Sequence, residues 1–381
     1  MTRIPIRNTS RYAPIRYEAT RPYAVRIGQR FATAARQGES ARMAFVRDEL
    51  FPLIRGELGR LGVPPGPGAG QAELTNVQLF GPFQQAGRLI FDVHRLLTQA
   101  LTVTDVKDVP CGALSFPAEH FYIHFGQESG ISSEGLPVEG VFVTHQETPH
   151  RLIIDLVPAG FYTNPYFWEM PMGEEPIGMS IDLSQPDMPV VTAMERSVAE
   201  TIERNRKIFQ EIEAMERQLS EQFGQLVRIP SPAERLDGKQ PALRQALQLV
   251  VNTCFFLAAT EDVHEGWELD APADLRLQAE HAEKPGTRKT AENTLTNSGY
   301  IKVRYVGQNY SSSQAAREVG EAIASGRTMP THFRRGHVRH QPYGPERALR
   351  KIVFIPPVTV NPHRAGDSPG RVYDVQPPVS D

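Results

Sequence analysis

The chain has 381 residues, 40% of them hydrophobic, so it is long enough to bury the cores of two modest domains and is not a disordered chain. A mean hydropathy of -0.36, the lack of an apolar run near the roughly 18 to 20 residues that a membrane helix needs, and the lack of a signal peptide predict a soluble, non-exported protein. Only two cysteines occur, Cys111 and Cys254, which excludes a disulfide framework and favours a reducing cytoplasm.

The net charge of -3 conceals basic ends around an acidic middle. Residues 1–50 carry ten Arg against four acidic residues, and residues 302–351 carry ten Lys and Arg against three Glu. Residues 51–301 carry an acidic excess of 15. This segregation has two interpretations, which the sequence leaves open: a surface for nucleic acid or another polyanion, or basic ends that neutralise the acidic body.

The first unit predicted along the chain is 1–72, a basic arm followed by helices and a linker. Residues 1–26 combine Arg, Tyr and Pro without a sustained period, which predicts a mobile arm. Apolar spacing from 28 to 61 predicts one or two helices, and the Pro- and Gly-rich stretch 64–71 ends them.

An acidic α+β body is predicted for 73–284. Apolar residues at three-and-four spacing between Leu79 and Leu101 predict one longer helix. Three segments rich in aromatic and β-branched residues then predict an antiparallel sheet: 113–126, 139–145 and 151–160. An exposed amphipathic helix near 194–223 and a more apolar, buried helix at 241–259 follow. The expected fold is an antiparallel sheet packed against the 77–103 and 241–259 helices.

A smaller, basic C-terminal α+β unit is predicted for 299–361. It would contain the strand GYIKVRYVG, a short helix, the Arg- and His-rich segment THFRRGHVRHQPYGP and the strand KIVFIPPVTV. Residues 362–381 are rich in Pro, Gly and Asp and are predicted to be a tail.

No familiar catalytic or cofactor signature is present, so no cofactor is expected. The candidate site residues are basic and aromatic side chains of the C-terminal unit: Lys302, Arg304, His332, Arg334, Arg335, His337, Arg339, His340 and Tyr343. Alternation along a strand would place Arg335, His337 and Arg339 on one face. The neighbouring Arg charges should keep these histidines largely neutral near neutral pH.

Three interpretations of this Arg/His block stay open. In an RNA-binding strand, the arginines would contact phosphates and Tyr343 would stack on a base. In a metal-independent ribonuclease, His332 and His337 would transfer protons while Arg334, Arg335 and Arg339 neutralise the phosphate. In a structural role, the block would pair with the acidic body.

No metal site is expected. His120 and His124 are four residues apart, which suits a metal site on a helix, but the flanking FYIHF predicts a strand.

The segment HFRRGHVRHQPYGP followed by KIVFIPPVTVN resembles a type V-A anti-CRISPR family of phages and mobile elements, the one that blocks biogenesis of the effector nuclease. The matching block consists of His332, Arg334, Arg335, Gly336 and His337, and the end of the next strand matches at Pro356 or Pro357, Val360 and Asn361. Weaker similarity in RLIFDVHRLLTQAL, SFPAEHFYIHF, LQLVVNTCFFLAATEDV and KPGTRKT extends the resemblance over roughly residues 88–361.

The resemblance implies a host-defence evasion protein of the bacterial host cytoplasm. Its implied partner is the nascent N-terminal peptide of a CRISPR effector nuclease, with the ribosome or mRNA as further partners and no membrane, and the implied result is loss of the nuclease mRNA. This adaptor function needs no catalytic residue and is preferred. The alternatives are a ribonuclease that uses the Arg/His block and a non-enzymatic RNA- or partner-binding protein of a mobile element.

Overall fold

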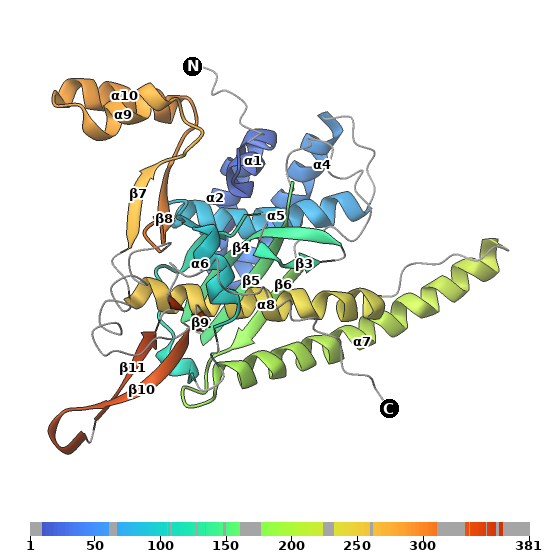
Figure 1. Ribbon diagram of the computed structural model, residues 1–381. Coiled ribbons are helices and arrows are strands. Elements are labelled where there is room, and N and C mark those ends of the chain that lie inside the picture. The colour runs from blue at the N-terminus through green and yellow to red at the C-terminus, as the bar shows by residue number, and fades with distance from the viewer. Residues whose placement is uncertain are drawn as a thin grey trace.

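The computed structural model describes most of the chain between residues 10 and 360 (Figure 1). The described residues are 10–60, 67–104, 106, 109–126, 129–133, 135–147, 150–160, 177–223, 232–259, 262–310, 332–334, 336–347, 349–355 and 358–360.

Helices occur at the N-terminal end, in the middle and near residue 290 of the described chain. They are α1 (Ala13–Thr20), α2 (Pro22–Arg36), α3 (Glu39–Phe45), α4 (Phe51–Arg60), α5 (Pro67–Gln85), α6 (Arg95–Thr102), α7 (Val190–Phe223), α8 (Pro232–Ala259), α9 (Ala273–His281) and α10 (Pro285–Asn297). A π-helical segment, Val46–Leu50, joins α3 to α4, and short 3-10 helices occupy Cys111–Ala113 and Pro345–Arg347.

An eight-stranded sheet is the centre of the fold. Its strands are β1 (Ile90–Val93), β2 (His120–His124), β3 (Ser132–Ser133), β4 (Leu136–Glu147), β5 (His150–Pro158), β6 (Ile177–Asp182), β7 (Val263–Trp267) and β8 (Lys302–Val306). The spatial order is β6-β5-β4-β2-β1-β8-β7, and β3 pairs with β4 alone. All pairs are antiparallel except those of β1, which runs parallel to β2 and to β8. The predicted α+β class and the antiparallel sheet within 113–160 are confirmed.

The sheet is covered on both faces, which makes three layers. Along β2, Phe121 and Ile123 enter one core while Tyr122 enters the other, because successive residues of a strand point to opposite faces. The first core contains residues of α6, α7 and α8, and the second contains residues of α1, α2 and α5. Double coverage explains why FYIH is buried throughout rather than alternating with polar residues.

The predicted helix between Leu79 and Leu101 is wrong in its middle. Helix α5 ends at Gln85, Gly87 and Arg88 adopt positive φ angles of 91° and 58°, and the chain re-enters the sheet as β1. A strand buried on both faces reads as a continuous apolar run, which spacing alone does not distinguish from a helix segment. The two ends of the predicted helix belong to α5 and α6.

The predicted mobile arm is wrong for residues 10–26. Helices α1 and α2 form there, and Tyr12, Ile15 and Tyr17 are at most 2% exposed. These aromatic and aliphatic side chains cover the sheet. The helices are stabilised by this burial, and the sequence shows no helical periodicity that would have predicted them. Residues 1–9 lie outside the described part of the chain.

The amphipathic helix α7 forms where it was predicted, and Figure 1 shows it extending away from the sheet. The apolar helix α8 forms over the predicted residues 241–259, but it begins earlier, at Pro232, so Pro241 lies inside the helix instead of in its first turn. Within α8, Gln240–Ala259 is long and apolar enough to cross a membrane by length and composition, contrary to the hydropathy-based expectation. That stretch is 67% buried inside the fold, and Leu247, Val250 and Cys254 belong to the first core.

The remaining strands form two small antiparallel sheets. They are β9 (His332–Arg334), β10 (His337–Tyr343), β11 (Leu349–Ile355) and β12 (Val358–Val360), paired as β10–β11 and β12–β9. Strand β11 contacts α8. Strand β8 was predicted within the same C-terminal unit, but it is hydrogen-bonded into the large sheet between β1 and β7, so residues 302–306 are part of the body.

Candidate functional site

The backbone of the Arg/His block is extended, as predicted. His332 and Arg334 lie on β9, and His337, Arg339, His340 and Tyr343 lie on β10. His337 and Arg339 occupy alternate positions of β10, opposite Ile355 and Val353 of β11. The two candidate acid–base residues, His332 and His337, therefore belong to different two-stranded sheets. Arg335 lies outside the described residues, as do the positions of the side chains in this block.

The other two candidate phosphate-binding residues, Lys302 and Arg304, lie on β8 in the large sheet. The ammonium group of Lys302 lies 3.6 Å from a carboxylate oxygen of Glu292 and 3.9 Å from one of Glu265. The guanidinium of Arg304 lies 5.8 Å from the ring centroid of Phe91. The charge of Lys302 is thus already opposed by two carboxylates, which leaves less of it for a phosphate.

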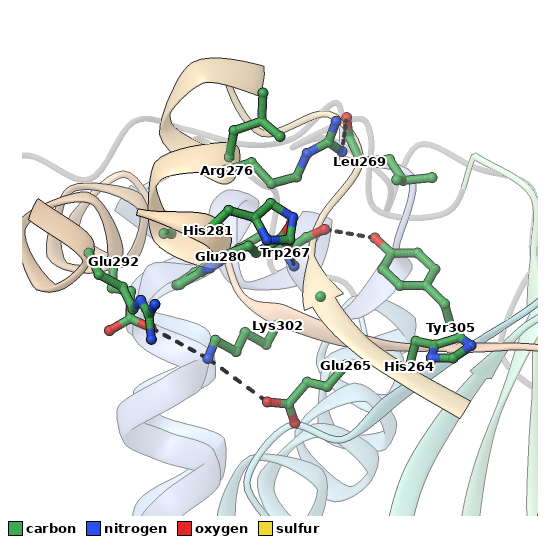
Figure 2. Close-up of a pocket in the computed structure, with 14 residues that line it drawn as sticks. His264, Glu265, Trp267, Leu269, Arg276, Glu280, His281, Glu292, Lys302 and Tyr305 are labelled. Atoms are coloured by element: carbon green, nitrogen blue, oxygen red, sulfur yellow. Dashed lines mark hydrogen bonds and ion pairs between the residues drawn. The ribbon is translucent and has the colours of Figure 1, made fainter. Parts of the chain in front are cut away.

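An open cavity lies between strand β7 and helices α9 and α10 (Figure 2). Its volume is about 680 Å³. Helices α9 and α10 pack on each other around a small core of their own, built from Trp267, Ala271, Ala279, Ala291 and Leu295. Figure 1 shows this helix pair standing at the end of the β7–β8 ribbon, away from the rest of the body. The cavity is therefore formed by a compact helical hairpin facing a strand.

The cavity wall combines exposed apolar side chains with charged ones. Leu269 and Leu277 line it and are 55% and 57% exposed, which makes them the most exposed large apolar residues in the described chain. Two guanidinium groups also line it: Arg276 donates to the carbonyl oxygen of Leu269 at 3.2 Å, and Arg288 donates to that of Ala282 at 3.0 Å. Three carboxylates line the cavity as well: Glu265 and Glu292 lie beside Lys302, and Glu280 accepts from the Trp267 N–H. The apolar side chains and the two guanidinium groups are the parts of the wall that suit apolar and acidic groups of a ligand.

Trp267 lines this cavity and also a second one of about 590 Å³, which shares Glu265, Glu292 and Lys302 with the first. Its ring lies 5.7 Å below the ammonium group of Lys302. Its backbone N–H donates to Glu280 at 3.3 Å, and its carbonyl accepts from the Tyr305 hydroxyl at 2.9 Å. Its indole N–H is buried and meets no acceptor in the part of the chain that the structure describes.

A row of buried polar residues crosses the sheet beneath α1. Tyr305, Asp92 and His124 are neighbours in register on β8, β1 and β2. The Tyr12 hydroxyl donates to Asp92 at 2.7 Å, and the Tyr12 ring packs edge-on against His124 with centroids 5.1 Å apart. Arg11 lies 3.3 Å from the same carboxylate.

Burial sets the protonation of this row. Desolvation raises the pKa of Asp92, against the opposing effect of Arg11, and raises the pKa of Tyr305 to about 12. Desolvation together with Arg11 and Arg16 lowers the pKa of His124 to about 3, so its imidazole is neutral at physiological pH. The row holds α1 on the sheet, and a neutral, enclosed imidazole suits that structural task.

The sequence interpretation did not identify the cavity or the buried row. Trp267, Leu269 and Leu277 lie in an acidic, polar stretch without a motif, and the sequence gives no signal that their side chains line a cavity. No group of three or more His, Cys, Asp or Glu that could hold a metal ion occurs among the described residues. His120 and His124 lie on strand β2, as predicted.

The family model described as the anti-CRISPR type V subtype A2 family, AcrVA2-like, matches residues 91–362. No curated protein matches. Among solved structures, one titled "Crystal structure of AcrVA2" is similar, with 13% sequence identity, a TM-score of 0.39, 92% of this chain covered and 100% of that chain covered. The family match covers the strands from β1, apart from its first residue, to β12 and both walls of the cavity, and on its extent the chain belongs to the AcrVA2-like family of type V anti-CRISPR proteins.

Proposed function

We propose that this protein inhibits a type V CRISPR system by recognising the nascent peptide of the effector nuclease and promoting loss of the mRNA that encodes it. The observation that carries the proposal is the family match over residues 91–362. Nascent chains and their mRNA meet at the ribosome, so the activity would take place in the cytoplasm of the bacterial host.

The structure supplies a surface that suits the peptide part of this proposal. The cavity beside β7 is open, has exposed leucines, and has two guanidinium groups that bond to backbone carbonyls and to no carboxylate within the described residues. Peptides are recognised by such combinations of apolar contact and directed charge. In the same proposal the Arg/His block contacts ribosomal or messenger RNA, with Arg334, Arg335 and Arg339 as phosphate contacts, aided by His340 and Tyr343.

The experiment is coupled translation of two recoded reporters in a bacterial extract, with the protein added. One reporter encodes the first codons of the effector nuclease with synonymous changes throughout, which alters the RNA and preserves the peptide. The other carries compensating frameshifts at the two ends of the same segment, which preserves most of the RNA and alters the peptide. We expect the mRNA to be lost from the first reporter and to persist in the second.

Two results would contradict the proposal. Loss of the frameshifted reporter, with survival of the synonymous one, would show that the RNA sequence is recognised instead of the peptide. Cleavage of a naked transcript by the purified protein in EDTA, abolished by His337→Gln, would favour the ribonuclease alternative, because glutamine keeps hydrogen-bonding capacity but carries no titratable proton.

A further inference from the structure

Strand β7 lies at one end of the large sheet. It pairs with β8 on one side, and no strand in the described chain pairs with its other side. An unpaired edge presents a row of backbone N–H and C=O groups, and these are complementary to another extended backbone.

The register identifies which groups point outward. In the β7–β8 pair, Gly307 donates to the Asp262 carbonyl at 3.0 Å, and Glu268 donates to the Ile301 carbonyl at 3.3 Å. Hydrogen-bonded and non-hydrogen-bonded pairs alternate in an antiparallel ladder, so the even-numbered residues of β7 bond to β8. The N–H and C=O groups of Val263, Glu265 and Trp267 therefore point away from β8.

The bonds of Trp267 agree with the outward direction of the odd-numbered residues and mark the end of the unpaired edge. Its outward N–H is already bonded, to the carboxylate of Glu280 on α9, at 3.3 Å. Its carbonyl accepts from Tyr305 at 2.9 Å. The outward groups of Val263 and Glu265 meet no partner among the described residues, so two residues of β7 offer two donors and two acceptors.

The cavity runs along this same edge. Its lining includes both His264 and Glu265, which point to opposite faces of the sheet because they are consecutive in a strand. Figure 2 shows Glu265 and His264 on the two sides of β7, with α9 beyond the end of the strand. A chain segment that paired with Val263 and Glu265 would thus lead directly to the wall formed by α9.

That wall defines which segment fits. Leu269 and Leu277 offer an apolar contact. Arg276 and Arg288 bond to backbone carbonyls and form no ion pair within the described residues, whereas Lys302 is occupied by Glu265 and Glu292. An apolar side chain followed by an acidic one satisfies both features.

We propose that an extended peptide with an apolar residue next to an acidic one adds to β7 as an extra strand, bonding to the backbone of Val263 and Glu265 and placing its side chains against Leu277 and Arg276. This inference rests on the proposed function, which supplies the source of the peptide, a segment of the effector nuclease. Strand addition supplies affinity through the main chain, and the α9 wall supplies selectivity through two side-chain positions.

The test measures binding of overlapping synthetic peptides from the effector nuclease to the full-length protein by fluorescence polarisation. Glu265→Pro removes the outward N–H, and proline is tolerated at such an edge position because no internal bond is lost. Glu265→Ala is the matched control, since it removes the same carboxylate and keeps the N–H. We expect about tenfold weaker binding for Glu265→Pro than for Glu265→Ala.

A second pair of variants tests the side-chain part. Leu277→Ala should weaken binding about tenfold, because the apolar contact is lost. Met43→Ala is the control, since Met43 is 53% exposed and lies on α3, away from β7. Hydrogen exchange should show the Glu265 amide unprotected in the free protein and protected with peptide bound.

Each outcome is decisive for the inference. Peptide binding that is equal in all four variants would overturn strand addition while leaving the proposed function in place. Protection of the Glu265 amide in the free protein would show that the chain covers its own edge, which also overturns the inference. Failure of every peptide to bind would overturn it too, and the translation experiment would then report separately on whether the peptide matters.

Discussion

Asp155 gives the sharpest thermodynamic prediction. Its carboxyl group is on β5, on the face covered by the second core, opposite Phe142 of β4 and Gly178 of β6. A Cβ atom on Gly178 would lie 2.5 Å from the Asp155 Oδ1, so glycine at 178 provides the space that the carboxyl group occupies. Burial raises the pKa of Asp155 to about 7.

The sign of the pH effect follows from the two pKa values. In the unfolded chain an aspartate titrates near its usual value of about 3.9, so between about pH 4 and 7 the folded state holds a proton that the unfolded state has lost. The free energy of unfolding of the wild type therefore decreases as pH rises through this window, by up to about 1.4 kcal/mol per pH unit and about 4 kcal/mol in all.

Asp155→Asn mimics the protonated acid at every pH and removes this dependence. The difference in free energy of unfolding between the variant and the wild type should shift in favour of the variant by about 2 to 3 kcal/mol between pH 5 and 7. His124 titrates in the opposite sense, because its pKa is lowered, but it is present in both proteins and does not contribute to the difference.

Urea denaturation followed by circular dichroism at pH 5, 6, 7 and 8 measures this difference. Asp274→Asn, which removes an exposed carboxylate on α9, is the matched control and should show no comparable shift. A difference between Asp155→Asn and the wild type that stays constant from pH 5 to 7 would refute the reasoning, because it would mean that Asp155 is charged in the folded state throughout.

Two further predictions concern packing and a buried ion pair. Arg16→Met should lower the free energy of unfolding by about 3 to 5 kcal/mol, because the Glu139 carboxylate, whose side chain is 3% exposed, would lose its cationic partner. Adding Glu139→Gln should restore part of the lost stability, because no charge is then left buried alone. A double variant no more stable than Arg16→Met would argue against the ion pair. Gly81→Ala should cost about 1 to 3 kcal/mol, because its Cβ would lie 2.4 Å from the Gly28 carbonyl oxygen where α2 and α5 meet. Gly56→Ala on α4, with no atom within 4 Å, should instead stabilise by about 0.5 to 1 kcal/mol, and thermal melts of both variants measure the contrast.

The parts of the fold that were predicted correctly are those with a strong local pattern. The charged, amphipathic α7, the apolar α8 and the aromatic strands β2, β4 and β5 carry their periodicity in the sequence itself. Strand β1 was missed because it is surrounded by sheet and helices on all sides and lacks alternation. Helix α1 was missed because its stability comes from tertiary contacts, such as Tyr12 with Asp92, that no local pattern reveals.

Of the candidate functional sites, the Arg/His block could be found from the sequence and the cavity could not. The Arg/His block was found because the residue types are concentrated in a short segment, and the extended backbone predicted for it is confirmed. The cavity was not found because its parts come from positions 264 to 305 through β7, α9, α10 and β8, and none of them is unusual alone. For Lys302, residue type alone does not predict the role: the sequence counts its charge as available for a phosphate, but in the structure two glutamates already lie beside it.

The second core is built in part from residues that precede the family match. The family match starts at residue 91, yet Ile27, Phe31, Phe80 and other residues before it cover Tyr122 on the sheet. A protein truncated to the matched region would leave that face as a broad apolar surface in water, and we expect it to aggregate. The N-terminal helices before residue 91 are therefore a structural part of this fold, because without them one face of the sheet has no cover.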